Sequence, residues 1–212
     1  MTWRAAIVAH TSRVEHAVTL AEQLGGAGIS VDDGTLGAEG NHKRVWAWHR
    51  DNTPTGWVVV LEDDSDPIPD FAEQLTQALQ VAPTPIVSFY LGRGRPPQYQ
   101  GHIELAVKEA DTQDACWIVD QKLLHAVAYA IHTSCLPSLI NRCTALPVDQ
   151  HITHWARNQH AISYTYPSLV DHLDLPTVIP RHADGAPRTE PRHAWITGSR
   201  QQWTNRAVDM PR

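Results

Sequence analysis

The stretch from Trp57 to Asp66, which reads WVVVLEDDSD, decides the fold that we expect for this chain. It begins with a continuous apolar run rich in β-branched residues, as is typical of a strand buried on both faces. Four acidic residues then follow within five positions. Because open α/β sheets bind their ligands at the C-terminal ends of the strands, this order predicts a ligand site directly after the strand.

The acidic residues after the strand also indicate what they bind. Side chains alternate between the two faces of a strand, so Glu62 and Asp64 point the same way if the strand continues that far. Carboxylates held so close repel each other unless a cation or a raised pKa relieves them. Mg²⁺ or Mn²⁺ is the simplest such cation, because hard cations prefer oxygen ligands. The alternative is a solvated acidic turn.

The composition of the 212 residues favours one domain with an appended tail. The net charge of −6 argues against general affinity for nucleic acids. Residues 180–212 carry six Arg against three acidic residues, a charge of +3, which leaves −9 for the remainder. No apolar run approaches the roughly 20 residues of a membrane span, and the start of the chain shows no signal peptide. Three Cys without metal-ligand spacing suit a reducing cytoplasm.

Hydrophobic spacing predicts alternating strands and helices along the chain. We expect strands at residues 5–9, 29–31, 57–61, 85–91, 115–119, 126–132 and, as the last one, 162–166. We expect helices at residues 14–24, 41–50, 70–80, 136–142 and 147–158, the first capped by Thr11 or Ser12, with a loop at residues 37–40. This alternation predicts an α/β fold with a mostly parallel sheet, followed by an irregular tail from about Pro180.

Five segments, in their order along the chain, carry a resemblance to a known class of enzyme. They are Asp32-Asp33-Gly34, residues 41–46 (NHKRVW), residues 58–64 (VVVLEDD), residues 88–97 (SFYLGRGRPP) and residues 166–172 (YPSLVDH). Together they resemble the GT-A nucleotide-sugar glycosyltransferases. They are most similar to the lipopolysaccharide-type glycosyltransferases of family 25, which carry a comparable Leu-Glu-Asp-Asp, and to small glycosyltransferase-like proteins of actinobacteria and their phages.

The resemblance covers most of residues 5–205 and implies an architecture. It implies a GT-A fold, which is a Rossmann-like α/β fold with a mixed, mostly parallel sheet flanked by helices. Residues 1–179 would form the catalytic domain. The Arg- and Pro-rich tail of residues 180–212 would pack on this domain or close over the site, with Trp195 and Trp203 as its contact residues.

The resemblance further implies a metal site. GT-A enzymes hold Mn²⁺ or Mg²⁺ with an Asp-x-Asp motif at a strand end, where the cation neutralises the departing diphosphate. The aligned pair here is Glu62 and Asp64, in which Glu62 departs from the pattern. A literal Asp-x-Asp also occurs as Asp64-Ser65-Asp66, so Asp66 is the alternative partner of Asp64. His172 is the candidate for a further ligand, against the alternative that it lies at a strand end without a metal.

A transferase also needs a base and a place for its donor. Asp149, which follows Pro147 at the start of an expected helix, is the candidate base, although it could instead only stabilise the helix N-terminus. Asp32-Asp33-Gly34 is also typical of a turn, and the basic pair at residues 43–44 is also typical of a solvated helix face. The candidate donor-binding residues are His10, Thr11, Arg13, Asp32, Asp33, Lys43, Arg44, Asp63 and Arg93.

Two further groups have open roles. Arg93 and Arg95 flank Gly94 in a loop that could touch an anionic acceptor or a donor phosphate, or could be a plain surface loop. His151 and His154 lie one helical turn apart, but no matching acid or Cys follows, so we interpret them as helix-surface residues.

The resemblance therefore implies a metal-dependent glycosyltransferase, which moves a sugar from a nucleotide-sugar donor, foremost a UDP-sugar, to an acceptor hydroxyl with inversion. The acceptor could be a glycan, a protein or a modified DNA base. We expect a cytoplasmic protein without a membrane span, and a phage-encoded one would act in the host cytoplasm. The alternatives are a non-catalytic module that binds nucleotide sugars or glycans with the same fold, and a metal-dependent nucleotide hydrolase.

Overall fold

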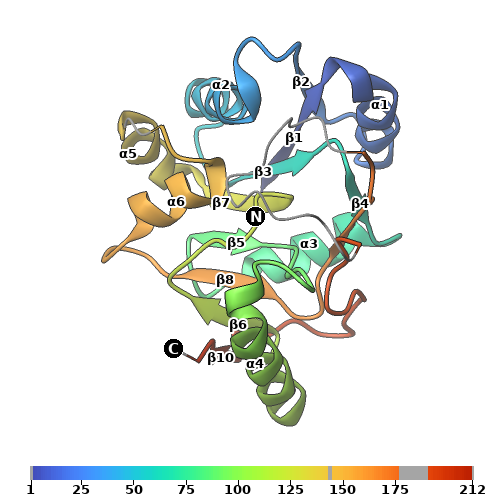
Figure 1. Ribbon diagram of the computed structural model, residues 1–212. Helices are drawn as coiled ribbons and strands as arrows, with labels where there is room; N and C mark the ends of the chain where they lie inside the picture. The colour runs from blue at the N-terminus through green and yellow to red at the C-terminus, as the bar shows by residue number, and fades with distance from the viewer. Residues whose placement is uncertain (1, 143–144, 177–190, 212) are drawn as a thin grey trace.

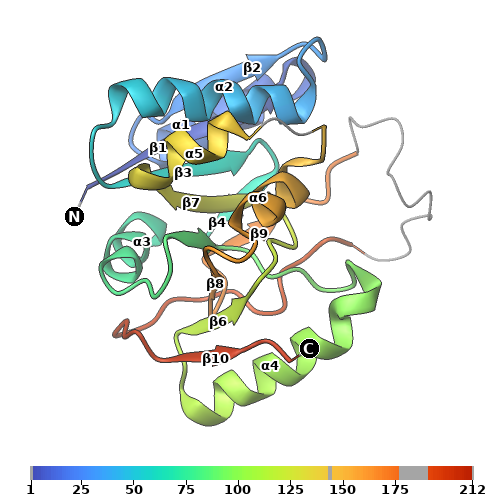
Figure 2. The same ribbon diagram turned by 90° about the vertical axis from the view of Figure 1, so that its left-hand side faces the viewer.

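The structure is a computed structural model that describes residues 2–142, 145–176 and 191–211. An eight-stranded sheet forms its centre, with the strand order β10-β6-β8-β5-β7-β3-β1-β2 (Figures 1 and 2). Four of the seven pairings described in this sheet are parallel, which confirms the predicted mixed, mostly parallel α/β fold. Its strands are β1 Trp3–His10, β2 Gly28–Asp32, β3 Trp57–Glu62, β5 Ile86–Ser88, β6 Trp117–Asp120, β7 Ala128–His132, β8 Ile162–Thr165 and β10 Ala207–Asp209.

Helices cover both faces of the sheet, and a small second sheet lies beside it. The second sheet pairs β4 (Ser65–Pro67) with β9 (Val170–His172) in antiparallel fashion. The α-helices are α1 Val14–Gln23, α2 Gly37–Asn52, α3 Phe71–Gln80, α4 Gln100–Gln113, α5 Leu136–Asn141 and α6 Val148–Ala156, and 3₁₀ turns occur at Thr11–Arg13, Pro97–Tyr99 and Thr133–Cys135. None of the helices in the described ranges is long and apolar enough to cross a membrane.

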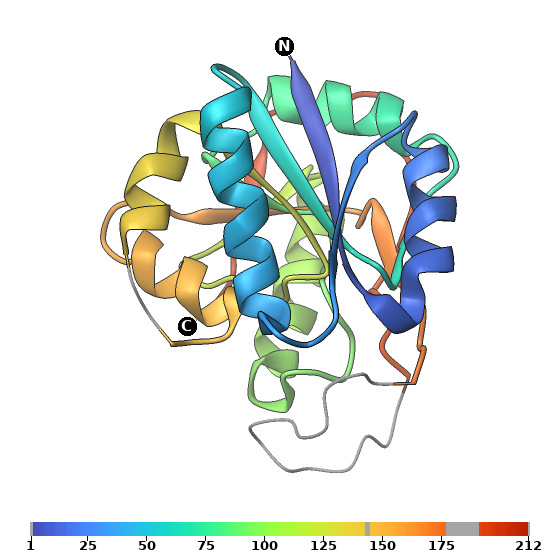
Figure 3. The same cartoon turned by 90° about the horizontal axis from the view of Figure 1, so that it is seen from above.

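Strand β3 lies in the middle of the core because its side chains are apolar on both faces. Val58 and Val60 pack in one hydrophobic cluster with residues of α2, α4, α5 and α6. Val59 and Leu61 pack in the other cluster with residues of α1 and α3. Figure 3 shows α1 (dark blue) and α2 (lighter blue) on opposite sides of the first strands. The apolar run of β3 is therefore buried on both faces, as its composition predicts.

Helix α1 starts at Val14 as predicted, but α2 starts earlier than predicted, and the expected cap before α1 is wrong. Asp32 accepts hydrogen bonds from the backbone N–H groups of Gly34, Leu36 and Gly37 at 3.0 Å each, so the expected loop at residues 37–40 is the first turn of α2. The segment after β1 starts as a 3₁₀ turn in which His10 Nδ1, and not Thr11 or Ser12, accepts the capping bond from the backbone of Ser12.

Other differences arise where tertiary packing overrides the local pattern. The sequence predicted no helix at residues 100–113, where α4 buries only a narrow stripe made of Ile103, Ala106 and Ala110. The strand expected at residues 85–91 is only three residues long, because the chain after Ser88 leaves the sheet. Val18 of α1 follows the helical spacing of the apolar residues but is 42% exposed.

The described part of the tail packs on the body and extends the sheet. Strand β10 pairs in parallel with β6 at the sheet edge. The prediction that residues 162–166 form the last strand is therefore wrong. Trp203 is buried, lies 5.4 Å from the ring centre of Trp117, and donates from its indole nitrogen to Gln74 Oε1 at 2.8 Å. The predicted boundary at residues 179 and 180 lies outside the described residues, as does the start of the irregular tail.

Strand register brings the chemistry-bearing residues to one edge. In the parallel pairs, His10 of β1 stands beside Asp32 of β2, and Val8 stands beside Glu62 of β3. The pairing of β4 with β9 places Ser65 opposite His172, so His172 lies next to the acidic turn after β3. The C-terminal ends of three neighbouring strands and one segment from far along the chain thus meet at a single place.

Replacement of Gly56 should test how tightly β3 is joined to the start of the chain. Gly56 has a φ of +107°, and a Cβ there would lie 2.2 Å from the carbonyl oxygen of Thr2. Gly25 has a φ of +72° but open space around it, so Gly25→Ala tests backbone strain alone, about 1–2 kcal/mol. We expect Gly56→Ala to lower the free energy of unfolding, measured with urea, clearly more than Gly25→Ala. Equal losses would contradict this account.

Candidate functional site

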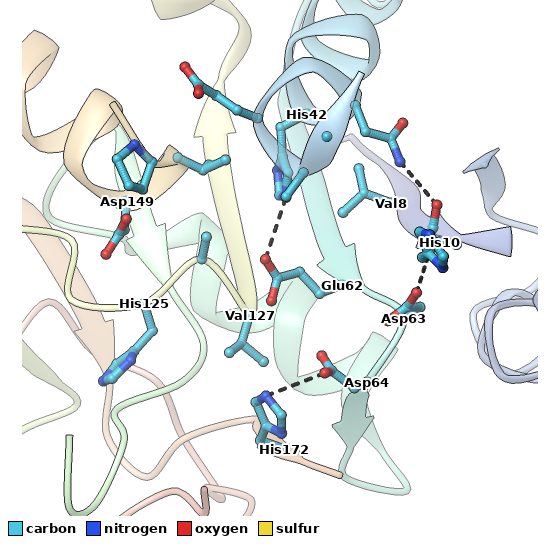
Figure 4. Close-up of a pocket in the computed structure, with 18 of the residues that line it drawn as sticks. Val8, His10, His42, Glu62, Asp63, Asp64, His125, Val127, Asp149 and His172 are labelled. Carbon is cyan, nitrogen blue, oxygen red and sulfur yellow. Dashed lines mark hydrogen bonds and ion pairs between the residues drawn. The ribbon is translucent and has the colours of Figure 1, made fainter. Parts of the chain in front are cut away.

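A pocket of about 730 Å³ lies at the C-terminal ends of β1, β2 and β3, and we call it the strand-end pocket. Its wall also includes the start of α2, residues 124–127 before β7, and the start of α6 (Figure 4). Eight of the predicted site residues line it: His10, Asp32, Glu62, Asp63, Asp64, Arg93, Asp149 and His172. Arg95, which had an open role, and Arg192 of the tail line it too.

The strand-end pocket does not include the other five candidate donor-binding residues. Thr11 and Asp33 are exposed at turns, and Asp33 accepts a hydrogen bond from the backbone of Thr35. Lys43 forms an ion pair with Glu39 one helical turn away. Arg44 donates to Ser30, Asn41 and the carbonyl of Val31. The fifth is Arg13, which lies behind the pocket wall.

Arg13 is an internal partner of the acidic turn and does not face the pocket. Its guanidinium lies 2.9 Å from Asp63 Oδ1 and 2.6 Å from Asp64 Oδ2, and it donates to the carbonyl of Pro176 at 2.6 Å. Asp63 also accepts the backbone N–H of His10 at 2.8 Å, so its carboxylate joins the ends of β1 and β3. Arg13 and Asp63 therefore connect the end of β1 to the acidic turn after β3 through contacts outside the pocket.

Asp64 retains one carboxylate oxygen without a partner. Oδ2 contacts Arg13 and lies 3.6 Å from His172 Nε2 and 3.8 Å from Arg192, but Oδ1 is buried and has no hydrogen bond. Burial and the charge of Glu62 raise the pKa of Asp64, although His172 and Arg13 oppose this shift. A buried acceptor without a partner is costly unless a ligand satisfies it.

His172 has the geometry of a side chain whose Nε2 is free to accept. Its Nδ1 donates to the carbonyl of Leu173 at 2.7 Å, which leaves the lone pair on Nε2. Burial lowers its pKa, with a further contribution from the charge of Arg192, while Asp64 opposes the shift. A lone pair and a carboxylate oxygen thus face each other at 3.6 Å, an arrangement that a shared cation or proton would relieve.

Glu62 is held by a chain of buried side chains that the sequence did not reveal. His42 Nε2 lies 3.6 Å from Glu62 Oε1, and His42 Nδ1 lies 2.7 Å from the hydroxyl of Tyr129. That hydroxyl in turn accepts from the indole of Trp46 at 2.9 Å, so it is free to donate to His42 Nδ1. Burial alone would raise the pKa of Glu62, but the neighbouring His42, together with His172 and Arg192, holds it below its ordinary value.

The structure distinguishes between the two registers of the acidic motif by position. Glu62 and Asp64 both line the strand-end pocket. Asp66 is exposed on β4, where it stands opposite Asp171 of β9, and it does not line the pocket. The pair brought together is therefore Glu62 with Asp64.

Asp149 lies on the first turn of α6 and faces the strand-end pocket, across from the acidic turn (Figure 4). Burial raises its pKa, and the charge of Glu62 adds to this, while a hydrogen bond with the backbone of Gln150 opposes it. Asp149 thus both contacts the backbone of the first turn of α6 and lines the pocket. A carboxyl with a raised pKa at a pocket wall is a candidate for proton transfer.

Tyr90, Gly92 and His125 form a further part of the site, and the sequence did not predict a role for any of them. Tyr90 and His125 pack edge to face with ring centres 5.0 Å apart. A Cβ on Gly92 would lie 2.7 Å from His125 Nε2 and 2.9 Å from the hydroxyl of Tyr90, so a larger residue there would displace these two side chains. Burial lowers the pKa of His125 to about 4, and its Nε2 has no hydrogen-bond partner. No local sequence signal marks His125, because its position depends on the fold.

His151 was predicted on the helix surface, and this is wrong. His151 is fully buried and its ring lies 5.6 Å from that of Trp46, so it contributes to the contact of α6 with α2. His154 is exposed, as predicted, and bonds with Arg142. Neither residue faces the strand-end pocket.

The metal prediction fits the donor atoms only in part. Among the described residues, no three His, Cys, Asp or Glu side chains come together at metal-ligand spacing. The partnerless Asp64 Oδ1 and the Nε2 of His172 are donors of the type that Mn²⁺ accepts. A divalent ion of this kind often takes only one or two carboxylates from the protein and completes its shell with substrate phosphates.

The comparisons with known proteins leave the function open. No protein-family model matches the chain, and no curated protein matches it. Among solved structures, the protein A197 from STIV is similar, with 7% sequence identity and a TM-score of 0.47 over 93% of this chain and 97% of that one.

Replacement of Arg13 should test whether its ion pairs with Asp63 and Asp64 stabilise the fold. Arg13→Met leaves two buried carboxylates without their partner, and we expect a loss of about 3–5 kcal/mol in the free energy of unfolding at pH 7. The loss should shrink as the pH falls, because the raised pKa of Asp64 lets its carboxyl take up a proton and so lose its ion pair with Arg13. Arg50→Gln, which breaks an exposed ion pair with Asp51, should have little effect at pH 7 or below. A small, pH-independent loss for Arg13→Met would contradict this role.

The lowered pKa of His125 predicts a pH dependence of stability. As pH falls below about 6.5, an unfolded His takes up a proton, but the folded His125 stays neutral until about pH 4. The wild-type protein should therefore lose stability across this window relative to His125→Gln, which does not titrate. Urea unfolding at several pH values measures the difference. Parallel curves for the two proteins would show that His125 is not shifted.

Proposed function

We propose that this protein is a metal-dependent glycosyltransferase that moves a sugar from a nucleotide-sugar donor, foremost a UDP-sugar, to an acceptor hydroxyl. One observation carries the proposal. In a single pocket at the strand ends, Asp64 has a buried oxygen without a partner, His172 presents its Nε2 to the same carboxylate, and Asp149 lies across from them.

Asp64 and His172 would hold the Mn²⁺ or Mg²⁺ ion, with Glu62 beside them. When bound, the ion would neutralise the charge that develops on the departing diphosphate. The protein prepares for this role through its own contacts. The carbonyl of Leu173 keeps His172 in the tautomer with a free Nε2, and His42 lies beside Glu62 and favours its ionised form.

The donor nucleotide would lie along the ends of β1 and β2. His10, Asp32 and the backbone of Gly34, Gly37 and Ala38 line that part of the strand-end pocket. The N-terminus of α2 lies there too, and helix N-termini favour negatively charged groups. Arg93 and Arg95 line the same pocket and could contact a phosphate or an anionic acceptor.

Asp149 would act as the general base. Its raised pKa brings the carboxylate closer to the working pH, which favours removal of a proton from an acceptor hydroxyl. The deprotonated oxygen would displace the nucleoside diphosphate directly, so the configuration at the sugar carbon would invert. The acceptor could be a glycan, a protein or a modified DNA base, and the site of action would be the cytoplasm.

A non-catalytic module that binds a nucleotide sugar is the second candidate. The contact of Arg13 with Asp64 favours it, because this guanidinium already supplies a positive charge to one of the expected metal ligands. Such a module would bind its ligand without a metal ion and would release no nucleotide.

Thermal unfolding with nucleotides tests the proposed function. We expect UDP and UDP-sugars to raise the melting temperature in the presence of Mn²⁺, because a ligand that binds only the folded state stabilises it, by about 2.7 kcal/mol at 100 times Kd. Asp64→Asn should abolish the metal-dependent part of this shift. Asp66→Asn is the matched control, since Asp66 is exposed outside the pocket, and it should behave as the wild type.

The rate of nucleotide release with an acceptor separates the two candidates. Asp149→Asn should retain the thermal shift but lose transfer by about 10²–10⁴-fold. Stabilisation without Mn²⁺ and without any release of nucleotide would favour the binding module. No shift with any UDP- or GDP-linked ligand would reject both candidates.

A further inference from the structure

A second pocket, of about 640 Å³, lies between α2 and the edge of the sheet formed by β1 and β2. We call it the edge pocket. It exists because small residues face α2 at this edge: Ala6 packs on the α2 side of the sheet, and Gly28 stands beside it in the parallel register. It is lined by residues 3–6, 24–30, 44–45 and 48–49, and none of these is shared with the strand-end pocket.

The edge pocket is positively charged in a protein of net charge −6. Arg4 and Arg44 line it, and no Asp or Glu does. The hydrogen-bond acceptors of Arg44 are all uncharged: Ser30 Oγ, Asn41 Oδ1 and the carbonyl of Val31. Within the described residues, the side chain of Arg4 is exposed and forms no hydrogen bond or ion pair. These two charges favour an anionic ligand.

A buried nitrogen in the pocket wall also lacks a partner. His49 is 2% exposed, and its Nδ1 lies 2.9 Å from the hydroxyl of Thr53. Its Nε2 is buried and has no hydrogen bond. When the Thr53 hydroxyl donates to Nδ1, Nε2 carries the proton and needs an acceptor. An anionic oxygen next to Arg4 would satisfy it.

The same wall presents an aromatic face. Trp48 lines the edge pocket, is 55% exposed and packs edge to face against His49 with ring centres 4.8 Å apart. An exposed indole in the same pocket as two Arg residues is suited to stack on a planar base or an apolar sugar face. The volume lies within the range of pockets that take small molecules.

We propose that the edge pocket binds a phosphate monoester carried on a ring, of the kind found in nucleoside monophosphates and sugar phosphates. The phosphate lies between Arg4 and His49 Nε2, and the ring stacks on Trp48. This site is separate from the strand-end pocket and does not depend on the function proposed for it.

Isothermal titration of the full chain in metal-free buffer with EDTA tests this site, with AMP, glucose 6-phosphate, adenosine and inorganic phosphate as probes. We expect AMP or glucose 6-phosphate to bind, and adenosine and phosphate to bind at least about tenfold more weakly. The preferred phosphorylated probe identifies the ring. The exposed substitutions Arg4→Gln and Trp48→Ala should each weaken binding about tenfold or more. Arg50→Gln, also on α2 but outside the pocket, should leave it unchanged.

Asp64→Asn separates the two pockets and should also leave AMP binding unchanged. Binding that survives Arg4→Gln and Trp48→Ala but disappears in Asp64→Asn would belong to the strand-end pocket and would overturn the proposal. So would the absence of binding by both phosphorylated probes at millimolar concentration, or phosphate binding as tight as that of AMP.

Discussion

The site depends on the partners that stabilise three consecutive acidic side chains, Glu62, Asp63 and Asp64, at the end of the buried strand β3. Water solvates them only in part, so each carboxylate needs a partner from the protein. Asp63 is satisfied by Arg13 and by the backbone of His10, which ties the ends of β1 and β3 together. Glu62 lies 3.6 Å from His42 Nε2. Asp64 shares Arg13 but keeps one buried oxygen unpaired, so the carboxylate at the pocket wall has one unsatisfied acceptor.

The two carboxylates that line the pocket, Glu62 and Asp64, have different partners, and their pKa values shift in opposite directions. Glu62 has a lowered pKa, because His42 and the nearby cations outweigh burial. Asp64 has a raised pKa, because burial and the charge of Glu62 outweigh Arg13 and His172. Carboxylates whose pKa values are pushed apart in this way are able to take different roles in one site. The lowered pKa of Glu62 depends in turn on core residues, since Tyr129 and Trp46 fix the orientation of His42.

The sequence predicted the parts of this arrangement that are local in the chain. The run of residues 57–61 and the acids after it predicted both the central strand and the edge of the sheet where the pocket lies. The role of Arg13 could not be predicted, because an Arg after a strand could as well reach a ligand as a buried acid. His125 carries no local signal, and the segment of residues 41–46 does not show that His42 would reach Glu62, since both are brought to the pocket by contacts far apart in the sequence. Helix α4 was missed because its buried stripe consists of only three residues, two of them Ala.

Helix α2 connects the two pockets of the molecule. Its first turns, from Gly37 to His42, line the strand-end pocket, and its later turns, from Arg44 to His49, line the edge pocket. Between them, Asn41 binds the carbonyl groups of Ala9 and Ser30 and so holds the helix on β1 and β2. The early start of α2, which Asp32 causes, supplies the turn that reaches the strand ends. The Asp32 carboxylate therefore holds the first turn of α2, which lines the strand-end pocket, while the later turns of the same helix line the edge pocket.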